Sequence, residues 1–428
     1  MGLFKSSIIS GLGVVVRLLA QLGLNKVLAV YLGPAGFALV GQYQSILQIL
    51  SVFSTNTLGS GIVKTTAESD KEGSLQQATI DVWRASVAYS LASMVIVGLL
   101  AFFYGDSISK AFLGSAEFSK VPLFFAASFI FFCLNNILIS ILNGFGKVTL
   151  IMFSNISGSI IALLLVYVLV TKWNLFGALV ALSIYQGVWF FVTICLCIRY
   201  KWCELQNFFG NTSIKALKFL SGFMLMSLIT AICVPIAQLY LRNLFINEFS
   251  AESAGYWEAM QKLSIAYLSL ITTVLAIYFL PKYAKISNSK ELKFELKNGY
   301  LLVVPSLIVI LVIVYFLRDY IVSIVYSTDF SRVGDLLLYQ LIGDFFKICS
   351  WLLSYYLVAK AQIKAFISLE LFFTIFYVVL TEFFVKLLGF EYVALGYMLN
   401  YIFYFTLLFL LFSKKGGYFN KLDRGVYE

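Results

Sequence analysis

Apolar runs of about twenty residues recur along the whole chain, and they limit what it can fold into. An α-helix needs about 20 such residues to cross the hydrocarbon of a bilayer. Only 12% of the 428 residues are charged, roughly half the fraction typical of soluble domains. We therefore expect an all-α polytopic membrane protein. Twelve spans are predicted, at 7–32, 36–63, 82–104, 121–143, 148–170, 175–198, 216–241, 254–280, 298–317, 334–359, 365–385 and 392–412.

Basic residues are distributed unevenly between alternate connections. With a cytoplasmic N-terminus, the inner connections, helix ends and tails hold twenty Lys and Arg residues, the outer segments hold seven, and four fall inside spans. Cytoplasmic loops of membrane proteins carry such an excess, so both termini are predicted to be cytoplasmic. The net charge of +10 then reflects loops that face anionic lipid, and no nucleic-acid partner is expected.

The composition offers little for metal or catalytic chemistry. The chain has no histidine, and its six cysteines lie mostly in apolar runs, where a free cysteine behaves as a small hydrophobic residue. The segment Gly144–Lys147 ends in GK but lacks the rest of a phosphate-binding loop. We expect no metal, no cofactor, and neither an ATPase site nor a catalytic motif.

A short segment near the start of the chain recurs just after its midpoint. Residues 35–46 read AGFALVGQYQSI, and residues 254–265 read AGYWEAMQKLSI. They lie in the second span of each half. Six spans per half make the two copies parallel, as in many transporters. We expect two six-helix lobes, 1–205 and 206–428, related by a pseudo-two-fold axis along the membrane normal.

The first span contains two cations. Arg17 and Lys26 are nine residues apart, which places them on opposite faces of a straight helix. Gly23 lies between them and would permit a kink. A charge near the bilayer centre costs about 2.5–3.5 kcal/mol on insertion scales. Arg17 is therefore expected to face an aqueous lumen, whereas Lys26 could equally extend to the outer interface.

Spans eight and ten carry charge pairs at helical spacing. Glu258 and Lys262 are four residues apart, and Asp344 and Lys347 are three apart, so each pair shares one helix face. Each could be a structural ion pair or could line a cavity. The cavity interpretation is favoured more for span eight, because it belongs to the repeated segment.

Other charges lie near span ends or alone. Glu370 and Glu382 have no neighbouring cation on their own helix within the predicted span 365–385, so each is expected to be protonated or paired across helices. Arg242 and Arg318 are predicted to lie at outer helix ends in solvated structural roles.

Several longer strings resemble one family. KVLAVYLGPAGFALVGQYQ, AGYWEAMQKLSIAYLSLITTVLAIYFLPKYA, and FLRDYIVSIVYSTDF followed by LLLYQLIGDFFKICSWLLSYYLVAKA resemble the Wzx-type flippases of O-antigen units and lipid III. These belong to the polysaccharide-transport branch of the multidrug/oligosaccharidyl-lipid/polysaccharide exporter (MOP) superfamily, with the MATE and MurJ proteins. The resemblance runs along essentially the whole chain.

This resemblance implies a carrier for an undecaprenyl-diphosphate-linked oligosaccharide in a bacterial inner membrane. The cargo would cross from the cytoplasmic to the periplasmic leaflet by alternating access through a cationic cavity. The residues expected to meet the diphosphate are Arg17, Lys26, Lys64 and Lys262, with Gln42 and Gln261 beside them in the repeated segment.

Two rival functions follow from the same features. A MATE-like, cation-coupled multidrug exporter would share the fold, but cationic drugs favour acidic cavities. A membrane-embedded polymerase or ligase needs a large periplasmic loop, and the longest outer connections here are 105–120 and 318–333. Proton or sodium coupling is compatible with Glu258, Asp344, Glu370 and Glu382. A monomer is expected, surrounded by membrane lipids, and the family suggests contacts with an O-antigen polymerase and a chain-length regulator.

Overall fold

The computed structural model describes residues 3–52, 54, 58–71, 75–286, 288–360 and 362–413. These residues form helices and turns and no strand, which confirms the expected all-α fold. The chain divides into two compact units, Met1–Leu239 and Tyr240–Glu428. The division falls within one helix, α7, so the lobe boundary at 205/206 stays a prediction.

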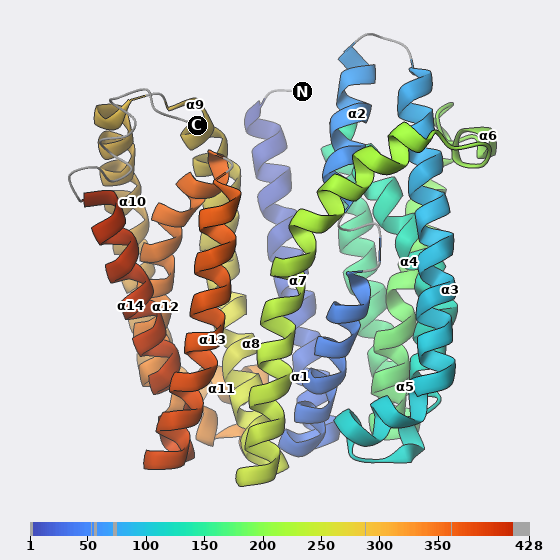
Figure 1. The fold of residues 1–428 in the computed structure, drawn as a ribbon. Coiled ribbons are helices and arrows are strands. Elements are labelled where there is room, and N and C mark those ends of the chain that lie inside the picture. The colour runs from blue at the N-terminus through green and yellow to red at the C-terminus, as the bar shows by residue number, and fades with distance from the viewer. Residues whose placement is uncertain are drawn as a thin grey trace. The chain divides into compact units, whose positions relative to one another are not determined.

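Unit 1 contains the first six helices and most of the seventh (Figure 1, blue to light green). Their bounds are α1 Leu3–Ser51, α2 Gly59–Lys71, α3 Gln77–Leu113, α4 Val121–Gly144, α5 Val148–Cys197, α6 Leu205–Phe208 and α7 Ile214–Glu248. Within this unit α5 packs along both α1 and α4, and α3 packs on α4.

Unit 2 contains the end of α7 and the remaining helices (Figure 1, yellow to red). Their bounds are α8 Ala251–Val274, α9 Leu280–Lys285, α10 Ser289–Phe316, α11 Arg318–Val325, α12 Arg332–Ala359, α13 Ile363–Leu388 and α14 Val393–Ser413. Helix α12 lies at the centre of the unit, in contact with α8, α10, α13 and α14.

Eight helices of the described chain are long and apolar enough to cross a membrane, so the protein is a multi-pass membrane protein. Two of the eight, α1 and α5, are interrupted by non-helical residues. Helix α1 changes direction at Gly33 (φ 62°), directly before Pro34. Helix α5 does so at Trp173 and Asn174. The total of twelve spans stays a prediction.

The second predicted span, 36–63, is wrong as a single helix. Helix α1 ends at Ser51 and α2 begins at Gly59. After α1 the Val52 amide donates to the Ile49 carbonyl, a three-residue turn that closes the helix end. The segment 54–61 is rich in Ser, Thr, Asn and Gly, which favour turns over helix interiors.

Side-chain caps set the start of helices α8 and α10. The Ser250 hydroxyl accepts a hydrogen bond from the Ser253 amide, 3.1 Å away, at the start of α8. The Asn288 side chain accepts one from the Glu291 amide at 2.7 Å at the start of α10. Each satisfies a backbone donor that the first helical turn leaves unpaired. These caps fix the residues at which α8 and α10 begin.

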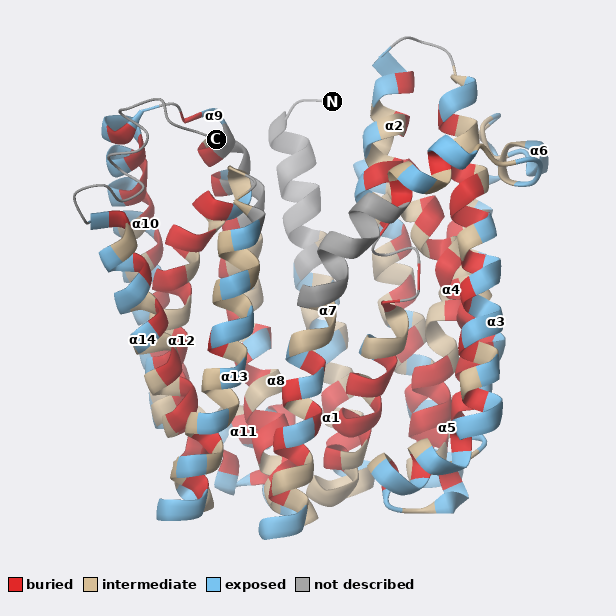
Figure 2. Cartoon of the chain, in the orientation of Figure 1, coloured by how far each residue is buried: buried red, intermediate tan, exposed pale blue. Residues whose placement is uncertain are grey.

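Many of the exposed side chains are apolar, as in a membrane protein and unlike a soluble one. Figure 2 shows exposed residues along much of α3, and they are large and apolar: Leu91, Val95, Leu99, Phe102 and Phe103 are among them. In a bilayer these side chains face lipid. Buried polar and charged residues are therefore the informative ones, and unit 2 contains most of the charged ones.

Candidate functional site

One carboxylate in unit 2 holds two cations in a buried cluster. The Arg242 guanidinium on α7 donates to Glu258 Oε2 from Nη2 at 2.5 Å and from Nε at 3.1 Å. Lys262 Nζ lies 3.5 Å from Glu258 Oε1, and the three side chains are 1–10% exposed. We call these three residues the Glu258 cluster. Its formal charges leave one net positive charge.

The sequence predicted only part of this cluster. The pair between Glu258 and Lys262 forms at its four-residue spacing. Arg242, expected in a solvated role at a helix end, is instead 1% exposed, and this prediction was wrong. Its guanidinium lies 5.5 Å from the Trp257 ring centroid. A buried guanidinium requires such partners, because an unpaired charge away from water is very costly.

A second buried carboxylate, Asp344 on α12, is held by neutral donors. Oδ2 accepts hydrogen bonds from Ser264 Oγ at 2.7 Å and from the Tyr267 hydroxyl. Oδ1 accepts from the Tyr397 hydroxyl at 2.7 Å and from Gln340 Nε2 at 3.4 Å. We call these five residues the Asp344 cluster. It joins α8, α12 and α14 through one side chain that is 0% exposed.

Lys347 does not form a close ion pair with Asp344, although the two share a face of α12. No described carboxylate lies within salt-bridge distance of its ammonium group. The ammonium instead lies 5.2, 5.6 and 5.4 Å from the ring centroids of Trp351, Tyr397 and Tyr401. Aromatic faces attract a cation at such distances. The charge of half-buried Glu370, on α13, also acts on Lys347.

A second amide, that of Gln261 on α8, extends the Asp344 cluster. Gln261 Nε2 donates to Gln340 Oε1 at 3.4 Å, and Gln340 in turn donates to Asp344. Gln261 is adjacent in sequence to Lys262. These hydrogen bonds therefore extend the Asp344 cluster as far as Gln261.

Glu382 requires a correction. It has a cation on its own helix, because α13 extends to Leu388 and so includes Lys386, whose Nζ lies 2.8 Å from Glu382 Oε1. The Tyr240 hydroxyl donates to the other carboxylate oxygen at 2.8 Å. The predicted span ended at 385, one residue too early to include this partner. Glu382 belongs to an exposed ion pair near the end of α13, outside the two clusters as defined.

Unit 1 carries its predicted cations on more open surfaces. Arg17 and Lys64 are exposed and Lys26 is half-buried. Lys64 Nζ lies 6.0 Å from the Phe219 ring centroid. Helix α1 runs through Gly23 without a kink, since its non-helical residue is Gly33.

Corresponding hydroxyls join three helices of unit 1. The Tyr43 hydroxyl on α1 lies 2.5 Å from Ser183 Oγ on α5, and Ser128 Oγ on α4 donates to the Ser183 carbonyl at 2.6 Å. The buried Gln42 precedes Tyr43. In chain order these helices correspond to α8, α12 and α14 of unit 2. The junction of unit 1 is neutral, whereas that of unit 2 contains Asp344.

Sequence reasoning missed Ser264, Tyr267, Gln340 and Tyr397 as partners of Asp344. One signal was present, because Ser264 lies in the repeated segment at the position of Ser45. The other three lack any marker in the sequence. Among the described residues no group of three or more Cys, Asp or Glu side chains is placed to hold a metal ion.

Comparison with known sequences decides the family. Residues 3–287 match the sequence profile of the family described as polysaccharide biosynthesis protein. The chain belongs to this family. Within the polysaccharide biosynthesis proteins it is similar to the lipid III flippase of Escherichia coli strain K12, with 26% identity over 418 residues, which cover 97% of this chain and 100% of the relative.

Solved structures with a similar fold are transporters of the MOP superfamily. An inward-facing multidrug resistance MATE family transporter matches with a TM-score of 0.79 at 15% identity, covering 96% of each chain. The lipid II flippase MurJ, in an inward closed conformation, matches with a TM-score of 0.70 at 17% identity, covering 95% of this chain and 87% of that one. This polysaccharide biosynthesis protein therefore has the MOP fold.

Proposed function

We propose that this chain is a flippase for lipid-linked oligosaccharides. Its cargo is an undecaprenyl-diphosphate-linked O-antigen unit or lipid III, moved from the cytoplasmic to the periplasmic leaflet of a bacterial inner membrane by alternating access. The full-length similarity to a lipid III flippase supports the cargo class. The observation that carries the chemistry is the Glu258 cluster, in which two cations share one carboxylate.

Lys262 is the cation of this cluster that we assign to the diphosphate. The Arg242 guanidinium donates to Glu258 at 3.1 Å and 2.5 Å, whereas the Lys262 ammonium lies 3.5 Å from the same carboxylate. A diphosphate offers charged oxygens that form stronger hydrogen bonds with an ammonium group than neutral acceptors do. Arg17, Lys26 and Lys64 would contribute further cations from unit 1, with Gln42 and Gln261 as polar neighbours.

The alternative cargo is a cationic drug, as for a MATE-like multidrug exporter. A drug cation would need an acidic group with spare negative charge. Glu258 is neutralised by two cations, and Asp344 is 0% exposed, so its carboxylate offers no surface to a cation of drug size. The net positive charge of the Glu258 cluster favours an anionic cargo.

Complementation tests this function. The gene is expressed in a strain that lacks its own Wzx-type flippases, and surface glycan and inner-leaflet lipid-linked oligosaccharide are both quantified. The wild-type chain should restore surface glycan and clear the intermediate. Lys262→Ala should leave the intermediate inside, while Lys386→Ala, which removes an exposed lysine outside the clusters, should behave as wild type. Normal flipping by Lys262→Ala would overturn the assignment of the diphosphate site.

The polymerase and ligase alternative is tested in the same strain. An enzyme of that kind would alter glycan chain length or attachment without clearing the inner-leaflet intermediate. Restored drug resistance with the intermediate still inside would favour the exporter.

The Asp344 cluster is the place that we propose for ion coupling. Protonation of Asp344 would turn one acceptor oxygen into a donor, and a bound cation would compete for the same oxygens. Either change would weaken the hydrogen bonds from Ser264, Tyr267 and Tyr397 and so loosen the contact between α8, α12 and α14. The corresponding junction of unit 1 consists of Tyr43, Ser128 and Ser183 and has no titratable carboxylate. A proton or sodium ion would therefore act on unit 2.

The setting of the chain completes the proposal. Both termini are placed in the cytoplasm, on the ground of the charge distribution. The protein works as a monomer surrounded by membrane lipids. An O-antigen polymerase and a chain-length regulator would act on the product at the periplasmic side and are proposed as partners.

A further inference from the structure

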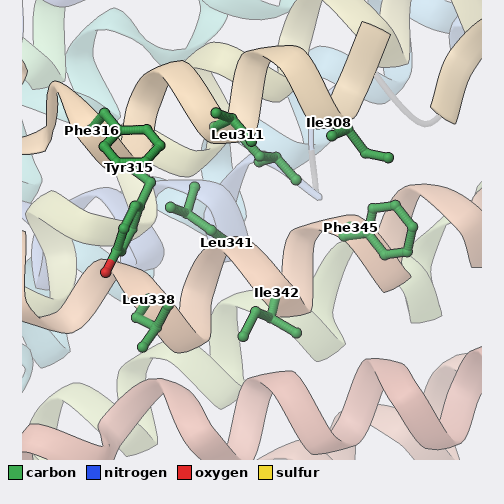
Figure 3. Close-up of a pocket in the computed structure, with 9 residues that line it drawn as sticks. Ile308, Leu311, Tyr315, Phe316, Leu338, Leu341, Ile342 and Phe345 are labelled. Atoms are coloured by element: carbon green, nitrogen blue, oxygen red, sulfur yellow. The ribbon is translucent and has the colours of Figure 1, made fainter. Parts of the chain in front are cut away.

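An apolar groove runs between α10 and α12 in unit 2 (Figure 3). Its volume is about 290 Å³. Nine side chains line it, at helical spacing on each side: Ile308, Leu311, Val312, Tyr315 and Phe316 from α10, and Leu338, Leu341, Ile342 and Phe345 from α12. Figure 3 shows the two rows facing each other along the helices.

The groove opens at the surface of unit 2. Val312 is 47% exposed, Phe316 78% and Leu338 43%, whereas Leu311 and Leu341 are buried and form its floor. Only apolar side chains and the Tyr315 ring line it. An open apolar groove of this kind matches a hydrocarbon chain.

One end of the groove carries a cation. Arg318 begins α11, directly after α10, and its guanidinium carbon lies 4.8 Å from the Tyr315 ring centroid. The Arg318 side chain also packs against α12 at Gly334: a Cβ atom added to that glycine would lie 3.8 Å from Arg318 Cγ and Cδ. Tyr315 belongs both to the groove and to the Arg318 contact, so the cation continues the groove at its α11 end.

The Arg318 guanidinium has capacity for an anion. Its Nε atom is buried and has no hydrogen-bond partner in the described chain. The nearest carboxylate, on Asp319, lies 3.9 Å away and is 83% exposed. A guanidinium offers five donors in a fork that matches phosphate oxygens. The buried Nε therefore identifies a donor for which no described side chain provides an acceptor.

We propose that this groove and Arg318 form a binding site for an anionic phospholipid. One acyl chain lies between α10 and α12, and the phosphate of the headgroup meets Arg318. With the orientation proposed above, the lipid belongs to the periplasmic leaflet. Its binding depends on unit 2 alone and does not require that the chain be a flippase.

A phospholipid fits this site better than the lipid-linked cargo. The site has one cation, Arg318, whose nearest carboxylate is the exposed Asp319 at 3.9 Å, and the groove lining has no polar side chain for sugars beyond the Tyr315 hydroxyl. The cargo carries a diphosphate, which would leave charge unpaired here. A bilayer also offers phospholipid at far higher concentration than any biosynthetic intermediate, so a shallow, open groove is filled by mass action.

Native mass spectrometry of the purified full chain tests the site. Palmitoyl-oleoyl phosphatidylglycerol and palmitoyl-oleoyl phosphatidylethanolamine are titrated separately, and the dissociation constant of the first bound lipid is measured. Phosphatidylglycerol should bind more tightly to the wild-type chain. A cation near a lipid surface contributes about fivefold in affinity. Arg318→Gln should therefore raise the dissociation constant of phosphatidylglycerol by about that factor and leave the dissociation constant of phosphatidylethanolamine unchanged. Arg318→Lys should retain the preference.

Two tryptophan variants test the groove itself. Ile342→Trp fills the groove from α12 and should weaken the binding of both lipids. Ile313→Trp places the same bulk on an exposed face of α10 that does not line the groove, and should bind as wild type. Thermal melting of each variant without added lipid shows whether it is folded, and Val312→Trp replaces Ile342→Trp if the latter is not.

Three results would overturn the proposal. Arg318→Gln and Ile342→Trp, both folded, could bind phosphatidylglycerol as wild type does. Arg332→Gln, which removes an exposed charge at the start of α12, could weaken binding as much as Arg318→Gln does, which would indicate diffuse surface attraction. Undecaprenyl phosphate could displace phosphatidylglycerol at equal concentration, which would assign the groove to a polyprenyl chain.

Discussion

At the scale of single residues, Glu258 is the group on which the buried charges depend. Glu258→Gln would leave Arg242 and Lys262 without their shared counter-ion, and removing one partner of a buried ion pair costs about 3–5 kcal/mol. We expect a clear fall in the melting temperature of the purified protein. Glu252→Gln, in the exposed first turn of the same helix, is the matched control and should change it little. Equal melting temperatures for the two variants would contradict the role of Glu258.

Asp344 should decide whether transport responds to an ion gradient. Asparagine preserves the size of the side chain but does not carry a negative charge, so Asp344→Asn should slow flipping at least about tenfold and make the residual rate independent of the gradient. The measurement is flipping of a fluorescent lipid-linked oligosaccharide in proteoliposomes with imposed pH or sodium gradients. A gradient response retained by Asp344→Asn would place coupling elsewhere.

Sequence reasoning predicted which residues share a helix face, but it missed contacts between helices and a partner beyond a predicted helix end. The four-residue spacing of Glu258 and Lys262 fixes a shared face, because helical geometry is local. Arg242 precedes Glu258 by sixteen residues and lies on another helix, so its partner depends on tertiary packing. Lys347 shows the same limit, since its spacing predicts a shared face with Asp344 but not the aromatic rings of α12 and α14 that hold its ammonium group.

At the scale of helices, Gly396 allows α13 and α14 to approach closely. A Cβ atom there would lie 2.5 Å from the Thr381 backbone, and small residues permit such backbone contact in membranes. Gly396→Ala should therefore separate the helices and lower the melting temperature. Gly98→Ala is the control, because its added methyl group would meet no atom within 4 Å. Alanine is also the better helix former by about 1 kcal/mol, so a melting temperature of Gly396→Ala at or above wild type would contradict the close packing.

The helices themselves were largely predictable from apolar length, since the bilayer imposes a minimum span. Their ends were less so. Helix α13 extends three residues beyond its predicted end at 385, and the second span divides after Ser51. Both errors arise where polar residues border an apolar run, because local contacts rather than hydropathy then determine where the helix stops.

At the scale of the whole molecule, the proposed orientation predicts which connections face the cytoplasm. In a background with the six native cysteines replaced by serine, Asp329→Cys should react with a membrane-impermeant maleimide in spheroplasts, and Lys201→Cys should react only after permeabilisation. Both positions are exposed, so burial does not limit labelling. The reverse pattern would place both termini in the periplasm and would invert the proposed direction of transport.

The fold-back of α5 has a consequence for how this protein is made. Its 50 residues would extend about 75 Å if straight, more than twice the hydrocarbon thickness. The chain instead reverses at Trp173 and Asn174, and Ser154 Oγ meets Thr193 Oγ1 at 2.7 Å. During synthesis Ser154 leaves the ribosome 39 residues before its partner. The Ser154 hydroxyl therefore gains this partner only after the second half of α5 has been synthesised and has folded back along the first.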